Sequence, residues 1–258
     1  MSQNSGVSII MAVWNQLGYT KLAVDSILRN KGASPFELVV VDNGSRPDVK
    51  AYFDLMSGKA DIKYIRNQRN VGPIAAINQG ISGSGRKYIM VMHNDVVIME
   101  PGWLDKITRV MDENARIGIV GLAGRQEIYA NGCVNEESLK HDLQNEDLNE
   151  PMKEESAWVA VIDGLCFTMR RELLDKIGGL DEAYGYMHCY DLDVSLESVR
   201  AGFRNMVLKI EAIHLGNGGM TRKTRDYKDL VKDDYGLLKR NCKVLAGKWR
   251  GLLPLKVA

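Results

Sequence analysis

Two features that are common in membrane proteins and nucleic-acid-binding proteins are missing from this 258-residue sequence. No apolar run approaches the roughly 20 residues that a membrane-spanning helix needs, and the polar start from Met1 to Gly6 lacks the apolar stretch of a secretory signal. Lys and Arg total 34 against 33 Asp and Glu, which is not the basic excess of a nucleic-acid binder. We therefore expect a globular, cytoplasmic protein that does not bind nucleic acid.

Cysteine is scarce and scattered. The sequence has four cysteines, widely spaced and without a CxxC pair: Cys133, Cys166, Cys189 and Cys242. A zinc site or a disulfide framework normally shows closer spacing or a Cys/His cluster. We expect four reduced cysteines, as is usual in the cytoplasm.

The familiar nucleotide-binding fingerprints are also absent. Gly83-Ser84-Gly85 starts like a GxGxxG motif, but Tyr88 stands at the third glycine position and the segment precedes a predicted strand. Gly80 and Gly85 have the P-loop spacing, yet Arg86-Lys87 replaces the required Lys-Ser/Thr. The sequence thus disfavours a dinucleotide-dependent dehydrogenase and a P-loop NTPase, and it has no GxSxG elbow.

Regular strand and helix signals fill the first half. The continuous apolar run Val7 to Val13 predicts a strand buried on both faces. Further strands are predicted at 38–41, 62–65 and 88–92, with helical patterns up to Asn30, up to Ile81, and from Pro101 to about Met111. This alternation predicts an α/β fold with a mostly parallel central sheet flanked by helices.

The second half is less regular. Strands are predicted at 116–122, Trp158 to Ile162 and Leu165 to Met169, and helices at 172–177, from Asp191 to Gly202, and over an amphipathic stretch from Tyr227 to Leu238. Residues 135–155 carry eight acidic residues against two lysines and are interpreted as a long loop or lid. Without a linker or repeat, we expect one domain over 1–258, divided into 1–115, 116–224 and 225–258.

Polar residues follow four of the predicted first-half strands. They are Trp14-Asn15, Asp42, the segment Asn70 to Gly72, and His93-Asn94-Asp95. Each alone is typical of an ordinary turn. Ligands of parallel α/β sheets collect at the carboxyl ends of the strands, so the joint position at one sheet edge predicts a binding site.

The chain resembles the family 2 glycosyltransferases, which have the GT-A fold. The resemblance is carried, in the order of the family, by VSIIMAVWN, ELVVVDNGS, RNVGPIAAINQGI, MHNDVVI, DGLCFTMRRELLDKIGGLDEAYG, YDLDVSLESVRAGF and AIHLGNGG, over roughly residues 7–216. It implies that a nucleotide-binding half precedes an irregular acceptor-binding half, and that a sugar is transferred from a nucleotide diphosphate donor with inversion.

The resemblance also implies a nucleotide site. The matching positions are Val13, Trp14, Asn15, Asp42, Asn70, Gly72 and Asn94. Asp42 matches the carboxylate that reads the nucleoside, and glycine at 72 lets the backbone approach the ligand. The donor is expected to be of the UDP type.

A metal site follows from the same resemblance. Asp95 matches the carboxylate expected to hold Mn²⁺ or Mg²⁺ against the diphosphate, and His214 matches a late histidine that completes the metal shell. A divalent cation stabilises the charge that grows on the leaving group. His93 occupies the position of a first acidic residue, which leaves one carboxylate and weakens the expected metal binding without donor.

Asp191 matches the carboxylate that takes the proton of the acceptor hydroxyl. Asp193 is the alternative base, and Asp191 can instead be a helix cap. Tyr190 replaces the family's glutamate, which puts the acceptor-side hydrogen bonds in doubt. Trp158, Asp163, Gly164 and Tyr190 are assigned to the pocket for the donor sugar and the acceptor.

The sequence leaves the acceptor open: a saccharide, a lipid-linked or another hydroxyl compound, in bacterial cell-surface polysaccharide or glycoconjugate synthesis. From Tyr235 onward six basic residues meet no acid. One hypothesis is that this tail, with Leu237, Leu238, Trp249, Leu252 and Leu253, contacts an anionic membrane at its inner face or a polymeric acceptor; the other is a solvated surface. A nucleotidyltransferase of similar fold and a non-catalytic nucleotide- or saccharide-binding homologue remain as alternatives.

Overall fold

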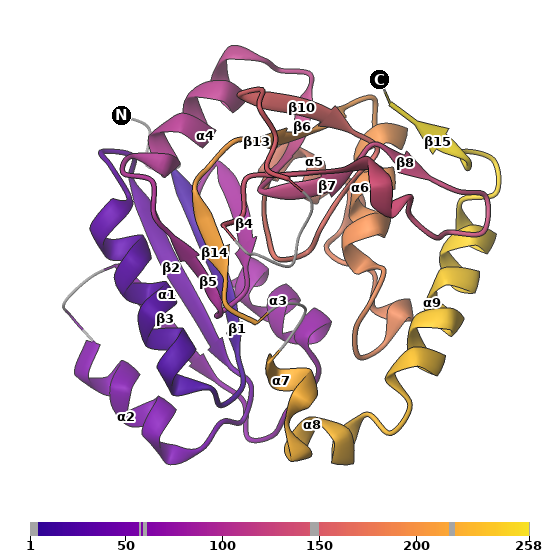
Figure 1. Cartoon of the computed structure of the whole chain (residues 1–258). Coiled ribbons are helices and arrows are strands. Elements are labelled where there is room, and N and C mark those ends of the chain that lie inside the picture. The colour runs from indigo at the N-terminus through magenta and orange to yellow at the C-terminus, as the bar shows by residue number, and fades with distance from the viewer. Residues whose placement is uncertain (1–4, 57, 59–60, 145–149, 217–219, 258) are drawn as a thin grey trace.

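The computed structural model describes residues 5–56, 58, 61–144, 150–216 and 220–257. Helices lie on both sides of a large sheet (Figure 1). The strands are β1 (Val7–Val13), β2 (Phe36–Asp42), β3 (Ile62–Arg66), β4 (Tyr88–Met92), β5 (Val96–Ile98), β6 (Ile117–Gly121), β7 (Ala123–Arg125), β8 (Glu127–Ile128), β9 (Leu139–His141), β10 (Ser156–Val159), β11 (Val161–Ile162), β12 (Cys166–Arg170), β13 (Arg204–Leu208), β14 (Ala212–His214) and β15 (Leu255–Lys256). The helices are α1 (Leu17–Asn30), α2 (Pro47–Met56), α3 (Pro73–Ser82), α4 (Trp103–Glu113), α5 (Arg171–Ile177), α6 (Tyr190–Arg200), α7 (Met220–Lys223), α8 (Arg225–Leu230) and α9 (Asp234–Lys248), with 3-10 turns η1 (Glu136–Ser138) and η2 (Glu182–Tyr184).

The large sheet joins both halves of the chain. Its order is β10-β13-β6-β12-β4-β1-β2-β3. β1 pairs in parallel with β2 and β4, β2 with β3, and β6 with β13, whereas β12 runs antiparallel between β4 and β6. The expected α/β architecture with a mostly parallel central sheet is confirmed.

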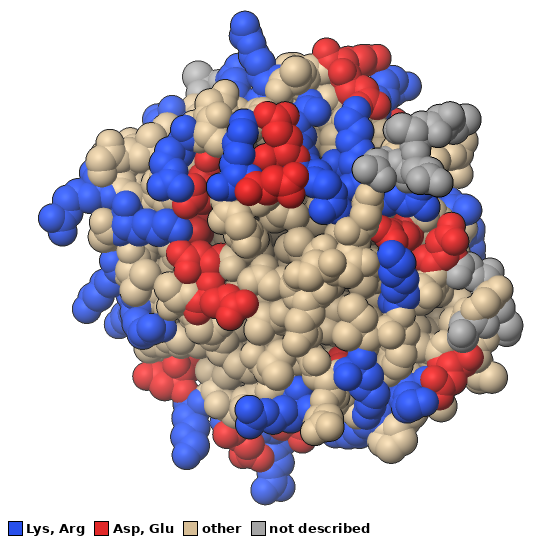
Figure 2. All heavy atoms as spheres, turned by 180° about the vertical axis from the view of Figure 1, so that it is seen from behind, with Lys and Arg blue, Asp and Glu red and all other residues tan. Residues whose placement is uncertain are grey.

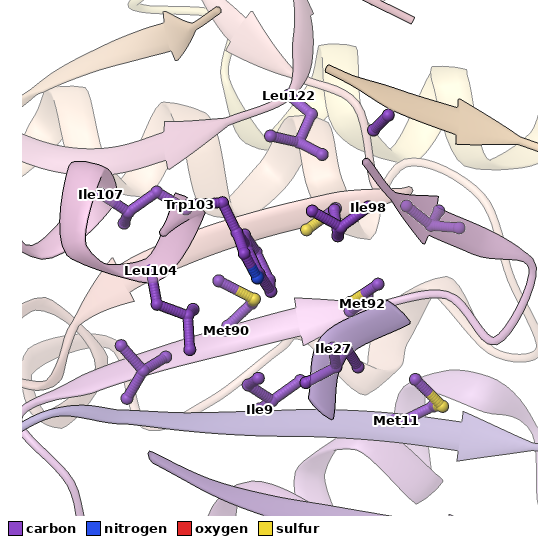
Figure 3. Close-up of a cluster of buried hydrophobic side chains, with 14 of the residues drawn as sticks. Ile9, Met11, Ile27, Met90, Met92, Ile98, Trp103, Leu104, Ile107 and Leu122 are labelled. Atoms are coloured by element: carbon purple, nitrogen blue, oxygen red, sulfur yellow. The ribbon is translucent and has the colours of Figure 1, made fainter. Parts of the chain in front are cut away.

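Two hydrophobic layers hold the sheet between its helices. Consecutive residues of a strand point to opposite faces, so Ile9 and Ile10 of β1, both fully buried, belong to different clusters. Figure 3 shows the first layer, in which Trp103 of α4 lies beside Met90 of β4 and Ile27 of α1 lies near Ile9 of β1. The second layer packs α3, α5, α6 and α9 on the other face. The resulting two-sided burial explains why the central strands are continuous apolar runs.

Several expected elements differ in detail. The predicted strand from Trp158 to Ile162 is two strands, because the chain leaves β10 at Ala160 and enters β11, which pairs with β7 in a separate sheet. The acidic segment 135–155 is not simply a loop, since η1 and β9 lie within it and β9 pairs with β7. Residues 145–149 lie outside the described residues.

The predicted last helix is also two helices. Thr224 caps α8 by accepting a hydrogen bond from the Tyr227 amide, and Asp233 caps α9 by accepting one from the Gly236 amide at 2.8 Å. A capping side chain stabilises a helix start, so the chain breaks between Leu230 and Asp234.

The C-terminal tail packs against the protein. Trp249 and Leu253 are 4 % and 8 % exposed and belong to the second hydrophobic layer, and Leu238 lines a cavity. Trp249 and Leu253 are therefore taken up by the protein core, whereas Leu237, Leu238 and Leu252 are only partly buried, and contact of the tail with a membrane stays a hypothesis. Among the described residues, no helix is long and apolar enough to cross a bilayer.

Charged side chains of both signs are interspersed on the surface. On the face opposite to that of Figure 1, they surround a broad uncharged area (Figure 2). The single net charge of the chain is thus an average over mixed surfaces and not a sign of few charges.

Candidate active site

The carboxyl ends of β1, β2 and β4 meet at one edge of the sheet because these strands are parallel. Trp14 follows β1, Asn43 follows β2, and His93-Asn94-Asp95 follows β4. β12 runs the opposite way and pairs Cys166 with Met92, so the residues before β12 reach the same edge. The edge therefore collects polar groups from both halves of the chain.

Two sets of contacts bring residues from the second half of the chain to this edge. β14 pairs antiparallel with β5, with His214 opposite Val96, and the Leu215 amide donates to the carbonyl of Asp95 at 2.9 Å. The backbone amide of Gly164 donates to Asp191 Oδ2 at 2.8 Å, which fixes the start of α6 against β12. Residues more than 100 positions apart in sequence thus become neighbours.

A cavity of about 590 Å³ opens at this edge. This is within the size range of small-molecule sites. Of the residues expected from the sequence, those that line it are Val13, Trp14, Asn70, Asn94, Asp95, Asp163, Gly164, Tyr190, Asp191 and His214.

Three side chains in the cavity can share a cation. His93, Asp95 and His214 each offer a ligand atom within 4.8 Å of the others. His214 Nε2 lies 3.2 Å and His93 Nδ1 4.0 Å from Asp95 Oδ1. Two imidazoles and one carboxylate form a mixed nitrogen and oxygen donor set, which is typical of transition-metal ions, whereas Mg²⁺ is usually held by oxygen ligands. The sequence pointed to Asp95 and His214 but not to His93, whose only signal was its place two residues before Asp95.

The electrostatics of these groups fit cation binding. Surrounding protein atoms withdraw the His93 ring from bulk water and lower its pKa to about 4, although 41 % of the side chain is still exposed to the cavity. Burial raises the pKa of Asp95, but the hydrogen bond from His214 and the two histidine rings outweigh it and leave the pKa below its usual value. At neutral pH the cavity therefore presents a neutral imidazole and a carboxylate anion.

Asp191 also lines the cavity, in the first turn of α6. Its two carboxylate oxygens accept the amides of Gly164 and Leu192, at 2.8 and 3.0 Å. Burial, together with the charge of Asp163, raises its pKa to about 6 in spite of these amides. A carboxylate with such a pKa is a more effective proton acceptor than an ordinary aspartate.

Glycine at position 164 leaves room for two neighbouring side chains. A Cβ there would lie 2.6 Å from the Tyr190 hydroxyl and 3.1 Å from Asp191 Oδ2, the first of which is closer than real Cβ atoms come to other heavy atoms. The Tyr190 hydroxyl in turn lies 3.4 Å from His93 Nε2. Gly164 and Tyr190 thus set the spacing between the metal-binding candidates and Asp191.

Asp193, the alternative base, is held by other partners. It is 3 % exposed and accepts hydrogen bonds from Tyr184 Oη at 2.8 Å, Trp249 Nε1 at 2.7 Å and Lys248 Nζ at 2.9 Å. These contacts connect α6 to the C-terminal end of α9. Of the two candidate bases, Asp191 lines the cavity, whereas Asp193 is held by these contacts outside the set of described lining residues.

Asp163 is paired with an arginine that sequence reasoning missed. Arg125 of β7 donates from Nη1 to Asp163 Oδ1 and from Nε to Glu136 Oε2 at 2.9 Å. Arg125 and Glu136 both line the cavity. No motif marks them in the sequence, because β7 is three residues long and Glu136 belongs to the segment interpreted as a lid.

Asp42 is fully buried and lies outside the set of described residues that line the cavity. Its carboxylate accepts hydrogen bonds from the Tyr64 hydroxyl, Arg66 and the Ser45 amide. The neighbouring Asn43 lines the cavity instead. The structure thus places Asp42 as support for the turn after β2.

Asn43 also organises the loop before α3. Its Nδ2 donates to Asn70 Oδ1 at 2.8 Å and to the Gly72 carbonyl at 3.2 Å, and its Oδ1 accepts the Val71 amide at 3.0 Å. Gly72 has a φ of 93° and therefore needs the conformational freedom of glycine. Asn70 lines the cavity, whereas Gly72 is outside the set of described lining residues.

Asn15 and Trp158 lie elsewhere. Asn15 lines a second cavity of about 420 Å³ together with Trp14, which borders both, and its Nδ2 donates to Asp226 at 3.3 Å. Trp158, on β10, packs its ring under the Arg204 guanidinium, 3.7 Å from the ring centroid. Trp158 is therefore not grouped by the structure with the other candidates for the sugar pocket.

The C-terminal helices complete the wall. His188 Nε2 and the Tyr227 hydroxyl lie 2.8 and 2.6 Å from Asp234 Oδ1, and Arg222 pairs with the other oxygen. Burial tends to raise the pKa of Asp234, but these three partners hold it at about 2. His188, Arg222 and Tyr227 line the cavity, so this cluster ties α7, α8 and α9 to its rim.

The family profile described as Glycosyl transferase family 2 matches residues 8–178. The chain belongs to this family. It is 26% identical over 212 residues to the uncharacterized protein y4gI of Sinorhizobium fredii, covering 78% of this chain and 23% of that protein. It is 22% identical over 201 residues to the chondroitin synthase of Pasteurella multocida, covering 76% and 20%. The chain thus spans about a fifth of the length of these curated relatives.

Solved glycosyltransferases share the fold. The mannosyltransferase PcManGT of Pyrobaculum calidifontis, in complex with GDP-Man and Mn²⁺, aligns with a TM-score of 0.63 at 14% identity over 98% of this chain and 71% of that one. GalNAc-T7 with UDP, GalNAc and Mn²⁺ aligns with a TM-score of 0.65 at 14% identity, covering 92% and 50%. TarS of S. aureus in complex with UDP-GlcNAc aligns with 0.60 at 16% identity, covering 88% and 64%. The family, the GT-A fold and the glycosyltransferase class expected from the sequence are confirmed.

Proposed function

We propose that this chain transfers a sugar from a nucleoside diphosphate donor to an acceptor hydroxyl, by direct displacement with inversion at the anomeric carbon. The observation that carries the proposal is the placement of Asp191 and of the cluster His93, Asp95 and His214 at one cavity. A displacement needs a base on the acceptor side and charge stabilisation on the leaving-group side. Family membership supports the reaction class.

The cluster suits a divalent cation such as Mn²⁺, which would stabilise the charge on the leaving diphosphate. Relatives in fold that are solved with Mn²⁺ support this choice. Asp95 and His214 are the proposed ligands, with His93 as the third. Mg²⁺ is the weaker candidate because it prefers oxygen ligands.

The nucleotide is proposed to lie along the ends of β1, β2 and β4. Val13, Trp14, Asn70 and Asn94 line this part of the cavity, and Asp42 acts there through the turn that carries Asn43. Trp14 offers an aromatic face for the base. A UDP-sugar is the proposed donor, and solved relatives in complex with UDP-GlcNAc or GDP-Man support a nucleotide sugar.

In the proposed reaction Asp191 accepts the proton of the acceptor hydroxyl as this oxygen attacks the anomeric carbon. The amides of Gly164 and Leu192 orient its carboxylate. Asp163, Gly164 and Tyr190 border the space between the base and the cation cluster, where the donor sugar would lie. The acceptor is proposed to be a saccharide or another hydroxyl compound of bacterial cell-surface polysaccharide or glycoconjugate synthesis, a role that the similarity to chondroitin synthase and hyaluronan synthase supports.

A donor-hydrolysis screen tests the proposal. The chain is incubated with UDP-, GDP- and dTDP-sugars, with Mn²⁺ or with EDTA, and the released nucleoside diphosphate is measured. We expect release from at least one UDP-sugar, dependent on Mn²⁺ and lost in Asp95→Ala. Asp54→Ala, which removes an exposed carboxylate of α2, is the matched control. Release of pyrophosphate from a nucleoside triphosphate, or no release with any donor, would contradict the proposal.

A further inference from the structure

Three of the four cysteines, which are far apart in the sequence, come together behind the cavity. Cys189 Sγ and Cys242 Sγ are 3.9 Å apart. Cys133 also interacts with the Cys242 thiol and helps to raise its pKa. The fourth, Cys166, is buried in the core of β12.

The three cysteines of the cluster come from segments that are far apart in the sequence. Cys133 lies in the turn after β8, Cys189 precedes α6 and Cys242 lies in α9. Gly132 packs so closely on α9 that a Cβ there would lie 2.7 Å from the Cys242 carbonyl oxygen. Asn241 holds the other side, because its Nδ2 donates to the carbonyls of Tyr184 and Met187 at 2.8 and 2.7 Å. The backbone thus holds the three thiols near one another.

Exposure increases in steps across the cluster. Cys189 is 3 % exposed, Cys242 is half-buried and Cys133 is exposed. Burial raises the pKa of Cys189 and of Cys242, so both stay protonated at neutral pH. A reagent from solvent therefore meets Cys133 first.

Cys189 connects the cluster to the proposed base. It is the N-cap of α6, two residues before Asp191, and it lines the cavity. Its φ is 66°, in the left-handed region that costs energy for a residue with a side chain. A shift of about 1 Å in a catalytic group can lower a rate by about a hundredfold.

We propose that Cys133, Cys189 and Cys242 form a thiol-oxidation site, in which a disulfide between Cys189 and Cys242 displaces the start of α6 and lowers sugar transfer. Joining the two sulfurs shortens their separation to about 2.05 Å. The consequence for transfer rests on the proposed function; the disulfide itself does not.

The chemistry requires an external disulfide of the glutathione type as oxidant. The Cys133 thiolate attacks one of its sulfurs, the S–S bond breaks, and one thiolate leaves. Cys242, as it loses its proton, attacks the Cys133 sulfur and expels the second external thiolate. Cys189 then attacks the Cys242 sulfur and releases Cys133. In total two protein thiols are oxidised, one external disulfide is reduced to two thiols, and these take up the two protons.

The experiment treats the whole chain with glutathione disulfide, alkylates the remaining thiols and maps peptides by mass spectrometry without reduction. We expect a link between the peptides of Cys189 and Cys242, with Cys133 and Cys166 alkylated. Cys242→Ser abolishes the link, Cys133→Ser slows its formation about tenfold, and Cys166→Ala behaves as the parent chain.

Transfer and UDP binding are measured on the same samples. We expect oxidation to lower transfer by the parent chain about tenfold, and dithiothreitol to restore it. Before oxidation, Cys242→Ser and Cys166→Ala should be as active as the parent chain. After oxidation, only Cys242→Ser should keep its activity. Absence of a linked peptide containing Cys189 overturns the site, and a full link with unchanged transfer overturns its effect. If the reduced chain transfers no sugar at all, the proposed function fails, while the peptide map still decides whether the disulfide forms.

Discussion

The two halves of this chain build their shares of the cavity in different ways. In the half made of β1 to β4, parallel strands end at one edge, so backbone topology alone places Trp14, Asn43 and Asp95. In the half after β6, short strands and long-range polar contacts do the same work, as when the Gly164 amide binds Asp191. The residues on the proposed nucleotide side are thus positioned by the sheet, whereas those on the proposed acceptor side are positioned by individual side-chain partners.

The largest expected effect is on the acceptor side, at Asp191. Asp191→Asn removes the proposed base but keeps the size of the side chain, so transfer should fall about 10³-fold. Binding of UDP with Mn²⁺ should change less than about twofold, because Asp191 is not one of the proposed nucleotide or cation ligands. Turnover is measured by UDP release and binding by calorimetry. Turnover close to that of the parent chain would show that Asp191 is not the base.

On the nucleotide side, Asp95→Ala should lower Mn²⁺-supported transfer about 10²-fold, because the only carboxylate of the cation cluster is lost. In this variant Mn²⁺ should no longer strengthen UDP binding. Titrations of activity and of UDP binding with Mn²⁺ measure both effects. Asp54→Ala is the control. An unchanged Mn²⁺ dependence in Asp95→Ala would show that Asp95 is not a ligand of the metal.

Asp193 sharpens the comparison within a single helix. Asp193→Asn leaves the cavity intact but weakens the contacts with Lys248, Trp249 and Tyr184. We expect the free energy of unfolding to fall by about 2 kcal/mol, as for loss of hydrogen bonds to a charged group. Denaturant unfolding measures this, and the folded variant should keep most of its transfer activity. A folded, equally stable and inactive variant would instead make Asp193 the base.

The smallest expected effect concerns pH. Because Asp191 acts as the anion and has a pKa of about 6, kcat/KM should fall as the pH drops through 6. The charge of Asp163 contributes to that raised pKa. Asp163→Asn should therefore move the fall of kcat/KM on the acid side to lower pH. At pH 5 the kcat/KM of this variant, relative to that of the parent chain, should change by less than about tenfold. Rate profiles of both chains measure the shift. If kcat/KM of Asp163→Asn falls at the same pH as in the parent chain, or at a higher pH, the charge of Asp163 does not raise the pKa of the base.

The same contrast explains how much the sequence could predict. The apolar run Val7 to Val13 must be a strand buried on both faces, and the residues after such strands must share an edge, so Asp95 could be found without coordinates. The sequence does not mark His93 as a ligand, because its ring comes near Asp95 only through the turn after β4. Arg125 could not be found at all, since three-residue strands such as β7 are too short to show a periodicity.

Burial and partner choice were the other limits. The sequence shows Asp42 at a strand end but not that Tyr64 and Arg66 already occupy its carboxylate. It also shows an amphipathic, basic tail without showing that Trp249 packs under α6 and donates to Asp193. Both depend on contacts between distant segments, which a local pattern does not encode.

The most direct test of the account is a calorimetric titration of UDP into the parent chain, with Mn²⁺ and again with EDTA. If the nucleotide lies at the strand ends beside His93, Asp95 and His214, UDP should bind at least about tenfold more tightly with Mn²⁺, and UMP should gain much less because it lacks the second phosphate. Equal affinities for UDP with and without the cation would contradict the shared nucleotide and metal site.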